Sequence, residues 1–92
     1  MAKVIKTSGE TIEVSPRNGK DFQLDELQEF VEGYIEMVYL DNGQLMVVNE
    51  EGKLEGLPYN PVATEVARSK CKYFVDDWIV GNVLVCNGYQ VK

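Results

Sequence analysis

The 92-residue chain contains no histidine. Histidine is the commonest general base in enzymes and a common zinc ligand, so its absence excludes the usual catalytic triads and histidine-based metal sites within one chain. Cysteine is scarce too: Cys71 and Cys86 are the only ones, and they form no C-x-x-C pair. We expect both thiols to be reduced and structural, with a disulfide between them as the alternative.

Long apolar runs and positive charge are also lacking. No run approaches the roughly 20 apolar residues that a membrane-spanning helix requires. The start of the chain, MAKVIKTSGE, has no apolar segment typical of a secretory signal, so we expect a cytoplasmic protein without a membrane segment. Nine Lys and Arg stand against fifteen Asp and Glu, a net charge of −6. Because phosphate binding needs a basic surface, this balance argues against direct nucleic-acid binding and favours a basic protein partner or a cationic ligand.

The length fits one domain, 1–92. Its first half is expected to contain a hairpin, a helix and a second hairpin: strands at 4–7 and 11–14, a helix at 24–33, and strands at 34–40 and 44–50. Gly33 is placed to end the helix, where a positive φ costs glycine nothing. Asn42-Gly43 between two apolar runs is a strong hairpin signal.

The second half begins with a helix at 60–70, because Asn60 suits the N-cap and Pro61 the first helical position. A strand at 78–86 has few polar residues and is expected to be central. Asn87-Gly88 then turns the chain into a short last strand at 89–91. The order ββ-α-ββ-α-ββ predicts an α+β fold: a mostly antiparallel sheet with two helices on one face.

The stretch NEEGKLEGLPYN, residues 49–60, joins the second hairpin to the second helix. Two compatible hypotheses describe it. In the structural one, Gly52 and Gly56 take special backbone angles, Leu54 and Leu57 enter the core, and Asn60 caps the helix. In the functional one, the stretch is a fixed loop that presents charged side chains to a ligand or partner, since such loops on a rigid scaffold commonly carry binding sites.

The candidate binding residues come from this loop, from the acidic first helix and from the last long strand. They are Asn49, Glu50, Glu51, Lys53, Tyr59, Glu26, Glu29 and Asn82. Adjacent Glu50 and Glu51 point to opposite faces of an extended chain, so no metal site is predicted. The Asp76-Asp77-Trp78 run reads as a turn before a core tryptophan, with acid–base catalysis by the two aspartates as the alternative.

Three segments of the chain carry a family resemblance: LDELQEFVEGYIEMVYL, NEEGKLEGLPYNPVAT and DDWIVGNVLV. They resemble the uncharacterised family catalogued as domain of unknown function 3846, over roughly Ile12 to Val85. Its members are small proteins encoded largely by bacteria, phages and plasmids. The family often has a second glycine next to Gly33, where this chain has Glu32.

The resemblance and the missing catalytic groups together lead to a functional expectation. We expect a non-enzymatic accessory protein of phages or mobile elements that binds a host protein stoichiometrically, without a cofactor, and counters a host defence system. One alternative is an oligomeric sponge, such as a homodimer, that holds a small nucleotide-like ligand with Lys53, Tyr59, Arg68 and Lys70. Another is an enzyme that uses Asp76 or Asp77.

Overall fold

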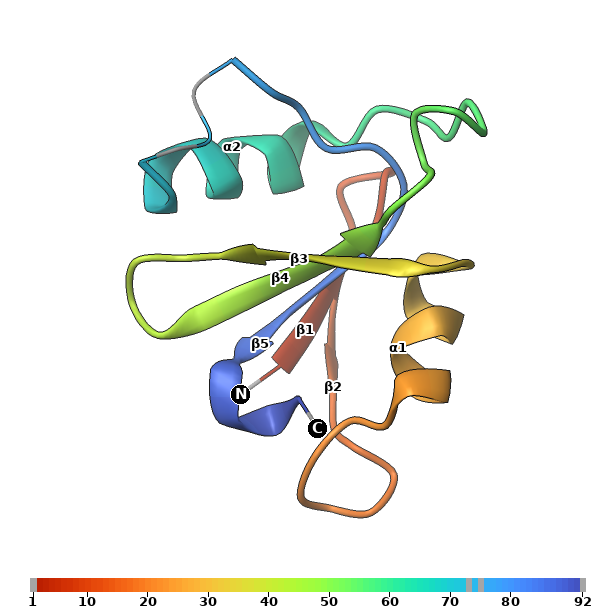
Figure 1. The fold of residues 1–92 in the computed structure, drawn as a ribbon, viewed down its shortest axis with the longest axis vertical. Helices are drawn as coiled ribbons and strands as arrows, with labels where there is room; N and C mark the ends of the chain where they lie inside the picture. The colour runs from red at the N-terminus through yellow and green to blue at the C-terminus, as the bar shows by residue number, and fades with distance from the viewer. Residues whose placement is uncertain (1, 73, 75, 92) are drawn as a thin grey trace.

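The computed structural model describes residues 2–72, 74 and 76–91 (Figure 1). Its elements are, in chain order, β1 (Ala2–Ile5), β2 (Thr11–Val14), α1 (Leu24–Val31), β3 (Ile35–Tyr39), β4 (Gln44–Asn49), α2 (Pro61–Lys70), β5 (Val83–Asn87) and the 3-10 helix η1 (Gly88–Gln90). The strands form one sheet in the order β2-β1-β5-β4-β3, and every neighbouring pair is antiparallel. The predicted α+β class and antiparallel sheet are confirmed.

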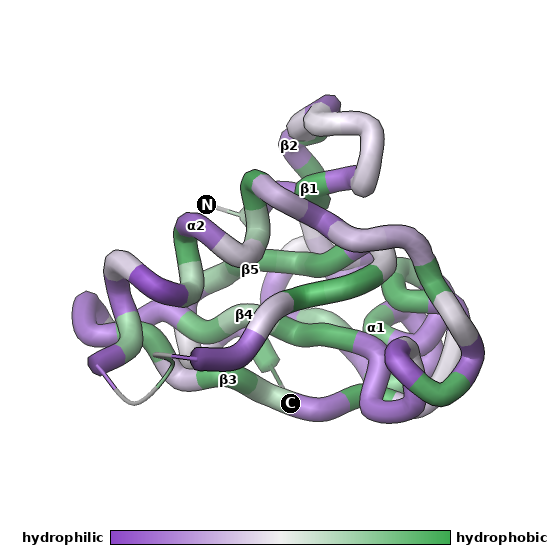
Figure 2. The backbone as a smooth tube through the Cα atoms, turned by 90° about the horizontal axis from the view of Figure 1, so that it is seen from above, coloured by the Kyte–Doolittle hydropathy of each residue, from purple (hydrophilic) through white to green (hydrophobic). Residues whose placement is uncertain are grey.

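The two helices lie on opposite faces of the sheet, so the prediction that both cover one face is wrong. In β4, Met46 belongs to the apolar cluster that contains Ala63 of α2, whereas Leu45 and Val47 belong to a separate cluster that contains Leu27 of α1. Figure 1 shows α2 above the sheet and α1 below it. Successive strand residues point to opposite faces, and an unbroken apolar run therefore needs cover on both sides. The hydrophobic colouring along β5 in Figure 2 reflects the same requirement.

The end of the chain differs from the predicted last hairpin. β5 lies between β1 and β4, so its predicted central place is confirmed, but it begins only at Val83. Upstream, Val80 makes an isolated bridge with Tyr59, and Gly81 has a φ of 78° that interrupts the extended chain. The expected final strand at 89–91 is replaced by η1 and a single parallel bridge between Phe22 and Val91. No helix within the described ranges has both the length and the apolar character that crossing a membrane demands.

The C-terminal end of α1 shows why the chain needs glycine at position 33. The left-handed residue there is Glu32, with a φ of 62°, and Gly33 does not have the positive φ predicted for it. A Cβ on Gly33 would lie 2.7 Å from Nδ2 of Asn49. Gly33 therefore provides space for a buried side chain of β4, while Glu32 carries the left-handed backbone conformation at the helix end.

Replacing Glu32 with glycine is expected to raise the free energy of unfolding by about 1 kcal/mol, because glycine adopts the left-handed region without the Cβ clash that other residues suffer. Urea denaturation followed by circular dichroism measures the change. The control is Glu65→Gly, an exposed site inside α2, where glycine is expected to lower stability by about 1 kcal/mol. Destabilisation by both substitutions would contradict the assignment of strain to Glu32.

Candidate binding groove

Residues 49–60, here called the corner, are fixed to the rest of the fold at their first residue. Asn49 is buried, and its Nδ2 donates to the backbone oxygen of Val31 at 3.0 Å and of Glu32 at 3.4 Å. Its Oδ1 accepts from the backbone N–H of Glu51 at 2.8 Å. One amide side chain thus satisfies carbonyls at the end of α1, which the helix itself leaves unpaired, and also holds the first turn of the corner.

Inside the corner the chain is folded into consecutive turns. The backbone N–H of Leu57 donates to the oxygen of Gly52 at 3.0 Å, and Gly56 takes a φ of 70°, as predicted. Gly52 does not have a positive φ; it is required because a Cβ there would lie 2.8 Å from Cγ2 of Val80. Leu54 was expected in the core but is 87% exposed, and only Leu57 is partly buried. The corner therefore has a fixed backbone and exposes two large side chains, Leu54 and Tyr59, to solvent.

Asn60 closes the corner with a completely buried side chain. Its Oδ1 accepts from the backbone N–H of Ala63 at 3.0 Å, which confirms the predicted N-cap of α2. Its Nδ2 donates to the backbone oxygen of Ile5 at 3.0 Å and of Gly81 at 2.9 Å. Asn60 thereby connects the end of β1, the approach to β5 and the start of α2.

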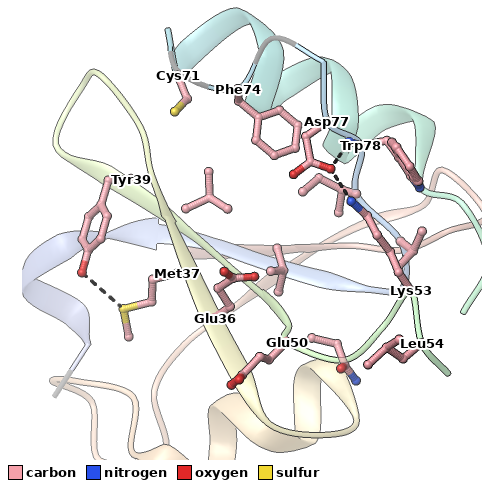
Figure 3. A pocket seen from close by; sticks show the side chains of 15 residues that line it. Glu36, Met37, Tyr39, Glu50, Lys53, Leu54, Cys71, Phe74, Asp77 and Trp78 are labelled. Atoms are coloured by element: carbon pink, nitrogen blue, oxygen red, sulfur yellow. Dashed lines mark hydrogen bonds and ion pairs between the residues drawn. The ribbon is translucent and has the colours of Figure 1, made fainter.

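The corner, β3, β4 and residues 77–80 enclose a groove of about 500 Å³ (Figure 3). Its apolar floor belongs to the cluster that packs α2 on the sheet and includes Val38, Val48, Phe74 and Ile79. Its rim carries charged and aromatic side chains: Glu36, Tyr39, Glu50, Lys53, Asp77 and Trp78. A volume of this size lies within the range of sites that bind a small molecule or a few side chains.

One wall of the groove contains the side chains of Lys53, Asp77 and Trp78, which contact one another. The ammonium of Lys53 forms an ion pair with Asp77 and lies 3.9 Å from the centre of the Trp78 ring, a cation–π contact. The backbone oxygen of Asp77 accepts from Nε and Nη2 of Arg68 at 3.1 and 2.9 Å. Trp78 is 46% exposed, so the prediction of a core tryptophan is wrong.

The charge of Asp77 is stabilised by these contacts. The hydrogen bond from Lys53 is the largest cause that holds the pKa of the Asp77 carboxyl below its ordinary value, with help from the backbone N–H of Trp78. The group is therefore an ionised acceptor at neutral pH. The contribution of this exposed pair to stability is expected to be small, at most about 1 kcal/mol. It is present above the carboxyl's unfolded pKa and is lost as pH falls through the lowered folded value.

Two carboxylates on another side of the groove, Glu36 and Glu50, have no cationic partner among the described residues. Within the described ranges, the ion pairs of the protein include neither Glu36 nor Glu50. Glu36 of β3 lies opposite Val48 of β4, so its side chain leaves the sheet on the α2 face, and Glu50 lines the same groove directly after the end of β4. In Figure 3, Glu36 and Glu50 lie lower in the view than Phe74 and Asp77. Sequence reasoning missed Glu36 as a site residue, although it is the one charged residue in the β3 run IEMVY.

The other predicted binding residues lie outside the groove, which contains Asn49, Glu50 and Lys53. Glu51 borders a small hollow beside Gly33, and Tyr59 borders another hollow beside α2. Asn82 accepts from the backbone N–H of Thr7 through Oδ1 at 3.0 Å.

The two candidate residues of α1, Glu26 and Glu29, both interact with other groups of the protein itself. Glu26 is only 4% exposed, and its carboxylate accepts the backbone N–H groups of Arg17 and Gln23, each at 2.9 Å. Glu29 forms an exposed ion pair with the guanidinium of Arg17. The acidic surface of α1 is thus partly neutralised by the loop that precedes it.

No metal-binding cluster is seen in the part of the chain that the structure describes, and neither cysteine there is in a disulfide. No group of three or more His, Cys, Asp or Glu side chains there could hold a metal ion. Both cysteines are free, and they pack against different clusters: Cys86 on the α1 face and Cys71 on the α2 face. Burial raises the pKa of the Cys86 thiol to about 11, so this thiol remains protonated at neutral pH.

These features define a small α+β protein: an antiparallel sheet covered by one helix on each face, with a groove beside the edge strand β3. The family described as Domain of unknown function (DUF3846) matches residues 2–90, and the chain belongs to this family. The resemblance inferred from the sequence is therefore confirmed. Comparison with curated proteins and comparison with solved structures each found no match.

Proposed function

We propose that the protein acts by stoichiometric, non-catalytic binding of a basic partner protein, and that the groove is its binding surface. The observation that carries the proposal is the pair of carboxylates without cationic partners, Glu36 and Glu50, beside the apolar floor of the groove. Desolvated apolar surface next to complementary charge is the arrangement that binding hot spots use. The net charge of −6 would also steer a basic partner toward the protein.

The large side chains at the rim favour a protein as the bound partner over water molecules or small ions. Tyr39, Leu54 and Trp78 are exposed large side chains around the groove. Aromatic side chains are enriched at the centres of protein interfaces, because they bury a large area at a small cost in side-chain entropy. The fixed backbone of the corner lowers the cost of binding further, since little chain must be ordered when the partner arrives.

Binding is favoured over catalysis by the state of the groups that an enzyme would use. Asp77, one of the two carboxylates of the enzymatic alternative, is bound to Lys53 and has a lowered pKa, which suits an acceptor and not a proton donor at neutral pH. The sponge alternative needs free cations for a phosphate-like group. Of the three cations assigned to it, Lys53 and Arg68 bind Asp77 already, and a ligand would have to displace them, which leaves Lys70 alone among the described residues of that set.

The biological setting is part of the proposal and is supported by family membership alone. Because the resemblance implies genes of bacteria, phages and plasmids, we propose a cytoplasmic host protein as the partner. Binding that counters a host defence system would be a natural role for such a protein.

Reversal of both groove charges tests the proposed function. Glu36→Lys with Glu50→Lys is expected to weaken partner capture from a bacterial lysate at least tenfold, because both unpaired carboxylates then repel a basic surface. Quantitative mass spectrometry of the captured proteins measures the loss. The matched control, Glu13→Lys with Glu65→Lys, makes the same change in net charge at exposed sites on β2 and α2 and should retain the partner.

The control decides how a loss is interpreted. If both double variants lost the partner equally, net charge alone would explain the effect. If both retained the partner, the groove would not be part of the binding surface. Native mass spectrometry of protein isolated from cells addresses the sponge alternative. A stoichiometric small molecule that remains bound would contradict the proposal of a protein partner.

A further inference from the structure

We propose that the partner enters the groove as an extended strand that pairs antiparallel with the free edge of β3 and directs alternate basic side chains at Glu36 and Glu50. This inference rests on the proposed function and specifies the chemistry of the partner. It would add a sixth strand to the sheet order β2-β1-β5-β4-β3, next to β3. Strand addition of this kind derives affinity from backbone hydrogen bonds and specificity from alternate side chains.

The hydrogen bonds at both ends of the β3–β4 pair show which backbone groups are available. The N–H of Leu40 donates to the oxygen of Gln44 at 2.9 Å, and the N–H of Glu50 donates to the oxygen of Tyr34 at 2.9 Å. Hydrogen-bonded positions alternate along an antiparallel pair. Positions 36 and 38 therefore also face β4, and the N–H and C=O groups of positions 35, 37 and 39 point away from the sheet.

Within the described part of the chain, β3 has little of the usual protection of an edge strand, and its one charged side chain is Glu36. Natural edge strands are commonly protected by proline, lysine, a bulge or a covering segment. The run IEMVY contains neither proline nor lysine, and its register with β4 is continuous from Ile35 to Tyr39. In the described part of the chain, β3 pairs with β4 alone. A segment of about five residues would match its length.

The position of the groove determines which side chains of an added strand would contact it. Side chains at positions 36 and 38 leave β3 on the α2 face, where the groove lies. Every second side chain of an added strand would lie on that face, beside Glu36 and Val38. Unpaired carboxylates and an apolar floor there favour lysine or arginine with a long aliphatic stem, since such side chains bury the stem and keep the charge at the rim.

Charge argues against a second copy of this chain as the occupant. Two copies each bring a net charge of −6. Antiparallel pairing of β3 with itself around Met37 would also place the two Glu36 side chains on one face, within the reach of a neighbouring cross-strand pair. A basic segment removes both sources of repulsion.

An alternating lysine–valine octapeptide with blocked ends is the probe, and isothermal titration calorimetry measures its binding to the full chain. In an antiparallel pair, the valines would lie opposite positions 35, 37 and 39 and donate their N–H groups to β3, whereas the lysine N–H groups would point outward. N-methylation of the valines is therefore expected to weaken binding at least tenfold. N-methylation of the lysines should change it less than about threefold.

Variants of the protein complete the test. Glu36→Lys should abolish binding of the peptide, and an alternating glutamate–valine peptide should not bind. Met37→Pro removes an outward N–H without removing a β3–β4 hydrogen bond, so the variant should fold and lose the peptide. Circular dichroism checks the fold, and the N-methylated peptides still decide the question if this variant does not fold.

Each remaining outcome has a defined meaning. Loss confined to lysine methylation would support strand addition but overturn the antiparallel direction. Insensitivity to both methylations, with sensitivity to Glu36→Lys retained, would overturn strand addition and leave the proposed function standing. A dimer in sedimentation analysis that excludes the peptide would assign the β3 edge to a second copy. If the variant Glu36→Lys with Glu50→Lys captured the partner as well as the unmodified protein does, that result would instead contradict the proposed function.

Discussion

Replacing Asn60 with alanine is expected to lower the free energy of unfolding by about 3–5 kcal/mol. The substitution removes an N-cap, worth about 1 kcal/mol, and leaves two buried carbonyl oxygens, those of Ile5 and Gly81, without the amide that donates to them, at about 1–2 kcal/mol each. Neither water nor another side chain can take this place easily, because the site is completely buried. Urea or thermal unfolding measures the loss.

Two further variants separate the parts of this effect. Asn60→Asp keeps the cap acceptor but turns an oxygen toward the two carbonyls, so it should also cost several kcal/mol despite its equal size, roughly as a buried unpaired group does. Asn42→Ala is the matched control: Asn42 is exposed in the β3–β4 turn, and its loss should cost less than about 0.5 kcal/mol. A cost for Asn60→Ala no larger than that of a lone helix cap would contradict the role of Asn60 as a connector.

Replacing Gly81 with alanine is expected to lower stability by about 2–4 kcal/mol. Part of the cost, about 1 kcal/mol, arises because Gly81 has a φ of 78°. The rest arises because a Cβ would lie 2.8 Å from Cδ1 of Leu57, and overpacking of this kind costs about 1–3 kcal/mol. The contact fixes the corner to the segment before β5, so the variant should also loosen the wall of the groove.

Gly19 offers a matched control for Gly81. Its φ is 75°, and nothing lies within 4 Å of the position where a Cβ would stand. Gly19→Ala should therefore cost only the backbone part, about 1 kcal/mol. Addition of Leu57→Ala to Gly81→Ala removes the clashing side chain, and the double variant should be more stable than the sum of the single losses predicts. Equal effects at Gly81 and Gly19 would show that the clash is relieved without cost.

Local signals in the sequence predicted much of the fold. Asn42-Gly43 forms the expected hairpin turn with a positive φ at Gly43, and Asn60 with Pro61 begins α2. These features depend on a few neighbouring residues, which is why a sequence can reveal them. The opposite placement of the helices depends on the pairing of strands far apart in the chain. The apolar run at residues 45–48 already indicated burial on both faces, but it does not say which helix covers which face.

The candidate site was less predictable than the fold. The ordered corner follows from its glycines and from Asn60, yet the groove depends on side chains from β3, the corner and the segment before β5. Trp78 was placed in the core because it is large and apolar, whereas its contact with Lys53 leaves it half-exposed at the rim. Glu36 can be recognised as a candidate site residue only once β3 is known to be an edge strand. Position in the sheet is a property of the whole topology and not of any short motif.

The place of β5 has a consequence for a nascent chain. Among the described strands β5 is synthesised after the other four, yet it lies between β1 and β4 and is the strand that pairs with both hairpins of the sheet. Until residues 83–87 leave the ribosome, the β1–β2 and β3–β4 hairpins have no common hydrogen bonds, and each exposes an inner edge. The sheet can therefore form as one unit only once residues 83–87 are available to insert between the two hairpins, so its two halves join late and at an internal strand.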